Sequence, residues 1–309
     1  MSATLDLAGV TTGVVTAFRP DGSIDWHSME RHIDFLKGKG LKGLLANAMM
    51  AEGLHLTRAE RDSSLKFILE RTGGELPVIA TIFGANTNEA ADEAYIAAHS
   101  GARALLVFPH PAFGGQPLDP AIPVGYFRAI HQRSGLPVIV FRLPAATAPS
   151  LDMDVIERLA DEKGVLGIKD SVADMSFYEA RGAALLSTGH PLKVFIDRDP
   201  VLPDYAARGV YGAMSIAAAA FPQPYVNLFH ASSERNGDKL ADRLSGFSEL
   251  IFRAPKRDFR ARLKEALRAQ GIVQSSRVRP PLPPLTQREL DEVVAVTAST
   301  HSSLLGITN

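Results

Sequence analysis

Eight short apolar runs recur along the chain up to residue 216, and segments with helical spacing separate them. The runs are GVVTAF, GLLANAM, PVIATIFG, ALLVFP, PVIVF, VLGIKD, KVFID and GVYGAMSI. Several of the intervening segments begin with Asn, Thr or Asp and end with Gly, which is typical of capped helices. Strand-helix alternation requires parallel strands, and continuous apolar runs indicate a sheet covered on both faces. Eight units in 309 residues therefore favour a (β/α)8 barrel over a doubly wound sheet.

The strand pattern stops after residue 236. The segments DKLADRLSGFSELIF and RDFRARLKEALRAQG have the spacing of amphipathic helices, and a stiff RPPLPPLT segment precedes a final helix from Gln287. We therefore predict a barrel over residues 1–236 and a C-terminal helical appendage over residues 237–309 that packs on it.

Composition excludes several classes of function. A formal net charge of -1 provides no basic field for nucleic acid. The chain has no cysteine, which excludes disulfides and thiol nucleophiles and fits a reducing compartment. The start MSATLDLAGV lacks the features of a signal peptide, and YGAMSIAAAAF is too short to cross a bilayer. We expect a soluble cytoplasmic protein that binds neither nucleic acid nor membrane.

In a barrel of this type the site lies where the strands end and run into their loops. Lys169 is the most distinctive residue there, because Gly167 and Lys169 face the same way and the glycine leaves room beside the long side chain. Poor hydration favours the neutral amine, which can attack a carbonyl and form a Schiff base. The alternative is an ion pair with a carboxylate at the barrel mouth.

Asp197 and Asp199 in IDRD are the one pair of carboxylates that suggests a divalent cation. No third ligand is spaced to join them, so a charge network or a helix cap is the better interpretation. We expect neither a metal nor a cofactor.

The segments GLLANAMMAEGLHLT, LLVFPHP, PVIVFRLP, GIKD and RGVYGAMSIAAAAFP resemble, in order and spacing, the dihydrodipicolinate synthase and N-acetylneuraminate lyase family. The resemblance covers the whole barrel. It implies a (β/α)8 barrel with C-terminal helices, a Schiff-base lysine on the sixth strand at Lys169, α-keto acid substrates, and a homo-oligomer, either a dimer or a tetramer built from dimers.

The chain departs from the family pattern at three places. A Gly-Thr-Thr-Gly-Glu type loop is typical of the family, whereas this chain has Met49 and Met50 in place of the two hydroxyls. At the position where the family has its catalytic tyrosine, in a Tyr-Asn-x-Pro pattern, this chain has Phe141, which cannot shuttle a proton. The family also has a tyrosine near the dimer interface, after a Pro-Pro pair, and the corresponding segment PHPAF of this chain has no clear counterpart to it. The proton relay that the resemblance implies is therefore absent.

Other strand-end residues are candidates to replace the lost groups. His110 is either an acid-base group, since imidazole titrates near neutral pH, or a loop residue that caps the backbone. Arg142 can clamp a carboxylate with its planar fork, although alternation from an inward Phe141 points it outward. Glu52 aligns with a family glutamate that suggests a structural role. The predicted substrate-binding set is Met49, Met50, Glu52, Phe141, Arg142 and Ser215.

These observations predict a cofactor-free lyase that breaks a carbon-carbon or carbon-oxygen bond of a small oxo-acid through a Lys169 imine. Dihydrodipicolinate synthase activity itself is not predicted, because its tyrosine relay is missing. The alternative is a catalytically impaired barrel that binds or senses a carboxylate or carbonyl ligand.

Overall fold

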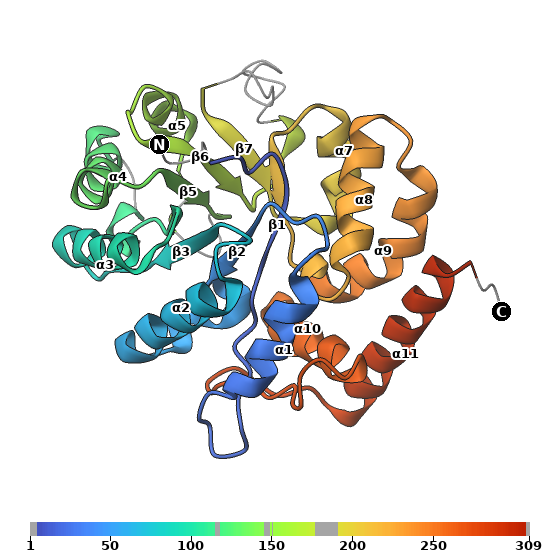
Figure 1. Ribbon diagram of the computed structural model, residues 1–309. Coiled ribbons are helices and arrows are strands. Elements are labelled where there is room, and N and C mark those ends of the chain that lie inside the picture. The colour runs from blue at the N-terminus through green and yellow to red at the C-terminus, as the bar shows by residue number, and fades with distance from the viewer. Residues whose placement is uncertain (1–4, 115–117, 145–148, 150, 177–190, 307–309) are drawn as a thin grey trace.

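The strands close into one parallel barrel (Figure 1). The structure is a computed structural model that describes residues 5–114, 118–144, 149, 151–176 and 191–306. Each strand pairs in parallel with the next, and the first also pairs with the last, so the predicted (β/α)8 barrel is confirmed. The strands are β1 (Gly9–Gly13), β2 (Gly43–Ala46), β3 (Val78–Ile82), β4 (Ala104–Val107), β5 (Val138–Arg142), β6 (Val165–Asp170), β7 (Lys193–Ile196) and β8 (Gly212–Met214).

The first strand lies earlier in the chain than predicted. The apolar run at residues 13–18 suggested it, but β1 occupies Gly9–Gly13. Val14 still donates a hydrogen bond to the Leu45 carbonyl of β2 at 3.1 Å, but Phe18 at the end of the run is buried outside the sheet, against the C-terminal region. The Phe18 ring lies 4.4 Å from the Lys264 ammonium and 4.5 Å from the Arg279 guanidinium. Apolar burial outside the sheet therefore produced the wrong strand position.

Helices surround the strands in Figure 1. Those with described residues are α1 (Trp26–Leu36), α2 (Arg58–Thr72), α3 (Thr87–Ser100), α4 (Ala121–Ser134), α5 (Met153–Ala160), α7 (Leu202–Ala207) and α8 (Pro222–Ser233). The cap signals in the sequence have their expected roles. At α2, Thr57 and Glu60 form a reciprocal capping box, and Gly73 ends the helix with a φ of 60°.

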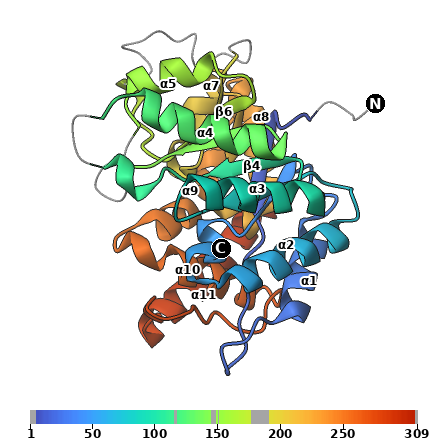
Figure 2. The same ribbon diagram turned by 90° about the vertical axis from the view of Figure 1, so that its left-hand side faces the viewer.

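Three further helices follow the barrel: α9 (Asp238–Phe252), α10 (Phe259–Ala269) and α11 (Gln287–Leu304). Figure 2 shows these orange to red helices gathered together below the green helices in that view. Helix α10 contacts the short turn η1 (Met49–Ala51) that follows β2, so the C-terminal region reaches a barrel loop. The domain division after residue 236 stays a prediction. In the described part of the chain, no helix combines the length and the apolar character needed to cross a membrane.

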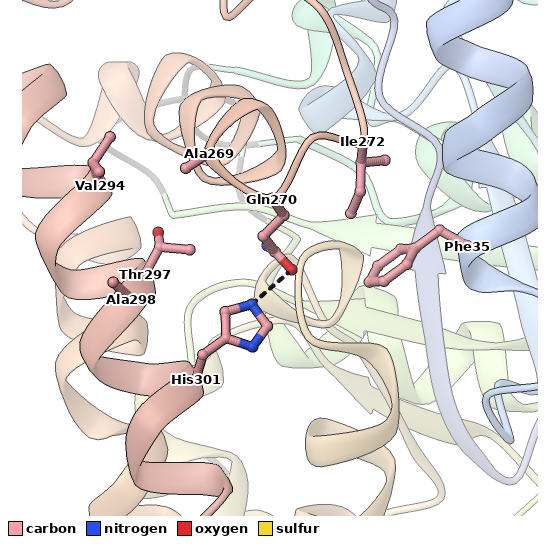
Figure 3. Close-up of a pocket in the computed structure, with 8 residues that line it drawn as sticks. All are labelled: Phe35, Ala269, Gln270, Ile272, Val294, Thr297, Ala298 and His301. Atoms are coloured by element: carbon pink, nitrogen blue, oxygen red, sulfur yellow. Dashed lines mark hydrogen bonds between the residues drawn. The ribbon is translucent and has the colours of Figure 1, made fainter. Parts of the chain in front are cut away.

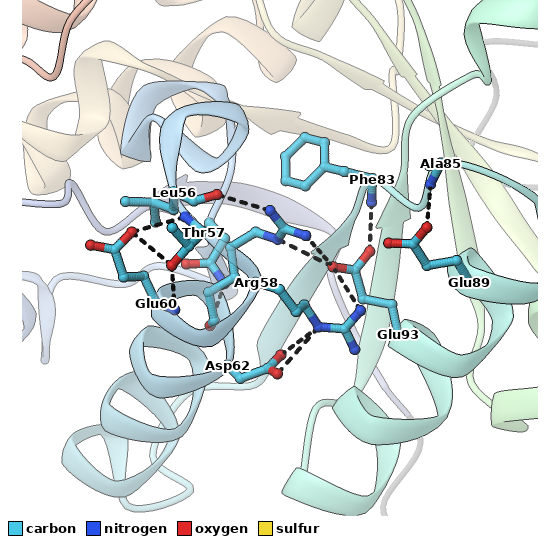
Figure 4. A network of polar contacts seen from close by, with 11 residues as sticks. Leu56, Thr57, Arg58, Glu60, Asp62, Phe83, Ala85, Glu89 and Glu93 are labelled. Atoms are coloured by element: carbon cyan, nitrogen blue, oxygen red, sulfur yellow. Dashed lines mark hydrogen bonds and ion pairs between the residues drawn. The ribbon is translucent and has the colours of Figure 1, made fainter.

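A polar network fixes the loops that follow β2 and β3 (Figure 4). The Glu93 carboxylate on α3 accepts hydrogen bonds from the Phe83 backbone N-H at 2.9 Å and from Arg61 Nη2 at 3.0 Å. Arg58 Nη1 lies 3.8 Å from the same carboxylate. Arg61 also donates to the Leu56 carbonyl at 3.0 Å. Helices α2 and α3 thereby hold the backbone at the edge of the barrel where a site is expected.

Candidate active site

A cavity of about 240 Å³ lies at the C-terminal ends of the strands. Residues at or just after the ends of β2, β5, β6, β7 and β8 line it, together with residues from the end of α9 to the start of α10. Its polar lining residues are Lys169, Ser171, Asp197, Lys256, Arg257 and Arg260. This is the end of a (β/α)8 barrel at which catalytic groups gather.

Lys169 is buried and faces this cavity, with a side chain that is 5% exposed. Its Nζ lies 2.9 Å from Asp197 Oδ2 and 3.8 Å from the centre of the Phe141 ring. Phe141 is the β5 residue in register with Lys169. The ion pair anticipated as one alternative is therefore present, and the amine also lines a cavity. The two alternatives do not exclude each other, because a carboxylate in contact with an ammonium can accept its proton.

Gly167 has a different role from the predicted one. A Cβ atom at this position would lie 2.1 Å from the backbone oxygen of Lys193, its partner in register on β7. Close pairing of β6 with β7 therefore requires the glycine. A side chain at residue 167 would thus clash with the β7 backbone before it could restrict the Lys169 side chain.

Asp197 has one oxygen in the ion pair and one without a hydrogen-bond partner. Its side chain is 5% exposed, and Oδ1 has no partner among the described residues. Asp199 lies close by, where its Oδ2 accepts a hydrogen bond from the Ala217 N-H at 2.8 Å. Burial raises the pKa of Asp199 to about 7, and the charge of Asp197 adds to the shift. Within the described ranges, no three His, Asp or Glu residues are grouped as metal ligands.

His110 lies in a neighbouring cavity of about 330 Å³. Met49 and Leu143 line both cavities, whereas His110 is not among the residues that line the Lys169 cavity. Both ring nitrogens contact the backbone, with Nε2 2.8 Å from the Ala85 oxygen and Nδ1 3.1 Å from the Ala112 N-H. These contacts match the capping alternative for this histidine.

The predicted substrate-binding residues fall into two groups. Met49 and Met50 line the Lys169 cavity, and Phe141 lies beneath the amine. Glu52, Arg142 and Ser215 are not among the residues that line it.

The three residues outside the cavity have other partners. Arg142 Nη1 pairs with Asp170 at 3.2 Å, in agreement with the outward direction that alternation suggested. The Ser215 hydroxyl accepts a hydrogen bond from the Ala218 N-H at 2.9 Å. Glu52 pairs with Lys264, and both side chains are fully buried. These contacts bind the barrel and its loops together.

The sequence reasoning missed three cations of the C-terminal region. Lys256 and Arg257 belong to the short turn η7 (Lys256–Asp258), and Arg260 lies in the first turn of α10. All three line the Lys169 cavity. The sequence signal for them is the basic run RAPKRDFRAR, which lies in the C-terminal region and not at a strand end.

Another cavity, of about 470 Å³, lies between α1, α10 and α11 (Figure 3). Among the described residues that line it, His301 is the one titratable group, and its Nε2 lies 3.1 Å from Gln270 Oε1. Burial lowers the pKa of His301. Since this cavity is away from the strand ends and has few convergent polar groups, the Lys169 cavity is the better candidate site.

The fold and the site define a (β/α)8-barrel protein with a buried lysine in a cavity at the C-terminal ends of its strands. Its sequence matches the model of the "Dihydrodipicolinate synthetase family" over residues 6–299. The chain therefore belongs to this family, as the sequence motifs suggested.

Similar proteins agree with this assignment at low identity. An uncharacterized DapA-like lyase of Halobacterium salinarum is 29% identical over 87% of this chain and 86% of its own length. A 4-hydroxy-tetrahydrodipicolinate synthase of Methylobacterium radiotolerans is 26% identical over 97% of each chain. A solved structure, described as a putative dihydrodipicolinate synthetase from Pseudomonas aeruginosa, has a TM-score of 0.85 at 21% identity and covers 96% of this chain and 100% of its own.

Proposed function

We propose that the protein is a cofactor-free lyase that breaks a carbon-carbon or carbon-oxygen bond of a small oxo-acid through an imine on Lys169. The observation that carries this proposal is the buried Lys169 amine, which lines the cavity 2.9 Å from a carboxylate. A relative named as a DapA-like lyase supports the class of reaction. Reaction as dihydrodipicolinate synthase is not proposed, because Phe141 provides no phenolic hydroxyl beneath the amine.

Asp197 is the group that we assign to proton transfer. It takes a proton from the Lys169 ammonium, and the neutral amine then attacks the carbonyl carbon to form a carbinolamine. Asp197 returns the proton to the departing hydroxyl, so that water leaves and a protonated imine forms. For a carbon-carbon bond, the imine nitrogen then accepts the electron pair of the bond that breaks beside it, while Asp197 takes the proton of the substrate hydroxyl that becomes a carbonyl. For a carbon-oxygen bond, the imine accepts the electron pair of the adjacent C-H bond, whose proton goes to Asp197, and the resulting enamine expels the hydroxyl, which takes that proton and leaves as water. General acid-base catalysis of this kind typically contributes about 10²–10⁴-fold.

The unpartnered oxygen of Asp197 supports this assignment. Buried carboxylate oxygens are normally hydrogen-bonded, whereas Asp197 Oδ1 has no partner among the described residues. A substrate hydroxyl or a water molecule in the cavity would satisfy it. We assign capping of the backbone to His110 and structural roles to Glu52, Arg142 and Ser215, while Met49 and Met50 form the apolar side of the binding site.

Borohydride trapping tests the Lys169 imine. We expect incubation with pyruvate or a longer 2-oxo-acid, followed by reduction, to add the mass of the reduced adduct to the intact protein. Peptide mapping should place the adduct on Lys169, whose buried amine faces the cavity. Lys239 and Lys66 are matched reference lysines in the same digest, and neither lines the cavity. A folded protein that gives no adduct with any member of a broad oxo-acid panel would exclude imine chemistry.

The second candidate function is a binding protein derived from an enzyme, and Phe141 is the observation that favours it. Its ring contacts the Lys169 ammonium at 3.8 Å, where a phenol would place a hydroxyl within the barrel. We expect Phe141→Tyr to lower the turnover of an active parent, because the added hydroxyl would lie beside the Lys169 ammonium and compete for its pair with Asp197. Steady-state rates on the trapped oxo-acid measure this change. Lyase activity that appears only in the Phe141→Tyr variant would instead identify the parent as the binding protein.

The oligomeric state stays a prediction. A dimer or tetramer is expected from the family resemblance, but one solved structure with this fold, at a TM-score of 0.86 and 20% identity over 97% of this chain, is described as a monomeric dihydrodipicolinate synthase variant.

A further inference from the structure

Arg260 is a buried cation that forms no ion pair with a carboxylate of the described residues. It is 6% exposed and lines the Lys169 cavity. Its Nε donates to the Met49 carbonyl at 2.7 Å and its Nη1 to the Arg257 carbonyl at 3.3 Å. No carboxylate of the described residues forms an ion pair with it. The charge of Glu52, which pairs with Lys264, favours the charged form of Arg260. Buried charges in proteins are normally paired, so this fixed guanidinium is positioned for a directly bound anion that the described residues do not supply.

The cavity as a whole is positively charged, like Arg260. Four cationic side chains line it, namely Lys169, Lys256, Arg257 and Arg260, whereas Asp197 is its one carboxylate among the described residues. That carboxylate is already engaged with Lys169. Partial burial lowers the pKa of Lys256, and the charge of Asp197 opposes the shift. Lys256 and Arg257 are exposed, so the excess positive charge lies at the solvent side.

We propose that Arg260 and Lys256 form a subsite for a second acidic group on the oxo-acid whose carbonyl reacts with Lys169. The identity of the reacting group rests on the proposed function. A guanidinium fork pairs equally well with a carboxylate or a phosphate. The cavity of about 240 Å³ has room for roughly eight water-sized groups, which is more than pyruvate fills. The substrate class is therefore a dianionic oxo-acid, with its carbonyl at Lys169 and its second anion at the mouth.

Two oxo-acids of equal chain length test the subsite. 2-Oxoadipate has a terminal carboxylate and 2-oxohexanoate lacks it. We expect calorimetry on the full-length protein to show about tenfold tighter binding of 2-oxoadipate, equivalent to roughly 1.4 kcal/mol. Arg260→Met should reduce the preference to under about twofold, because the fixed guanidinium is lost. Arg268→Met is the matched control, since Arg268 lies on the same helix, pairs with Glu265 and is outside the cavity.

A second variant keeps the test valid if Arg260→Met does not fold. Lys256 is exposed, so Lys256→Ala should leave the fold intact and still reduce the preference for 2-oxoadipate. Competition by inorganic phosphate that is stronger than competition by acetate would identify the second group as phosphate. Equal affinity of the wild-type protein for both oxo-acids would overturn the subsite. So would an unchanged preference in both variants.

The two proposals fail in different ways. Calorimetry with Lys169→Arg measures binding without an imine. A retained preference for 2-oxoadipate there, combined with no borohydride adduct in the wild-type protein, would remove the imine and support the subsite. An adduct that forms equally well with both oxo-acids would support the imine and remove the subsite.

Discussion

Replacement of Lys169 by methionine is expected to abolish both the borohydride-stable adduct and turnover of the oxo-acid. The amine is the atom that bonds to the substrate, and loss of a covalent nucleophile lowers rates by roughly 10⁴-fold or more. Methionine retains most of the side-chain length and the contact with Phe141. Intact mass after trapping and steady-state rates measure the two effects.

The control for this variant is Lys169→Arg. Removal of the ammonium takes away the ion-pair partner of Asp197 Oδ2, and Oδ1 already has no partner among the described residues, so the carboxylate stays buried without its counter-ion. Lys169→Met therefore risks a loss of stability. Arginine preserves a positive charge beside Asp197, yet its guanidinium stays protonated and does not attack a carbonyl. A Lys169→Arg protein that melts normally and still turns over the oxo-acid would exclude the imine mechanism.

The position of Lys169 was predictable because it depends on local pattern. An apolar run that ends in a charged residue marks a strand end, and eight strand-helix units determine that the strand ends meet at one side of a barrel. The ion-pair partner of Lys169 was harder to predict from the sequence. Asp197 was predicted to belong to a charge network or a helix cap, and its ion pair with Lys169 agrees with the first alternative, but this contact depends on the register between β6 and β7. No single strand contains that information.

Residues from the C-terminal region were not predictable from strand ends. Arg260 reaches the cavity because α10 packs on the turn at Met49, a contact across 211 positions. The first strand was misplaced for a related reason, since Phe18 is buried against Lys264 and Arg279 outside the sheet. An apolar run records burial without recording which element buries it. The contacts that the C-terminal helices make with the barrel therefore could not be predicted from local sequence pattern.

The appendage also fixes the loop after β2. Glu52 has a positive φ of 58°, which is unfavourable for a residue other than glycine. Its carboxylate accepts hydrogen bonds from the Lys264 ammonium and, at 2.8 Å, from the Arg279 N-H. The side chains of Glu52 and Lys264 are both fully buried. Burial lowers the pKa of Lys264 to about 8, with the charge of Glu52 opposing the shift. The loop that contains Met49 and Met50 is thereby held from the far end of the chain.

Lys264→Met is accordingly expected to lower the free energy of unfolding by about 3–5 kcal/mol, because it leaves the Glu52 carboxylate buried without its counter-ion. Chemical denaturation monitored by circular dichroism measures the change. Lys66→Met is the matched control, since Lys66 is exposed and its pair with Glu70 is a surface contact, which is worth at most about 1 kcal/mol.

The double variant Glu52→Gln/Lys264→Met separates loss of the ion pair from loss of side-chain packing. With neither member of the Glu52–Lys264 pair left charged, the double variant should be more stable than Lys264→Met alone.

Borohydride trapping should also be slower in Lys264→Met, although Lys169 is unchanged, because the Met49 carbonyl and the Arg260 side chain that it holds lose their fixed position. A Lys264→Met protein with the stability of Lys66→Met and a normal trapping rate would show that the appendage does not organise the site, and the Arg260 subsite would then lose its structural basis.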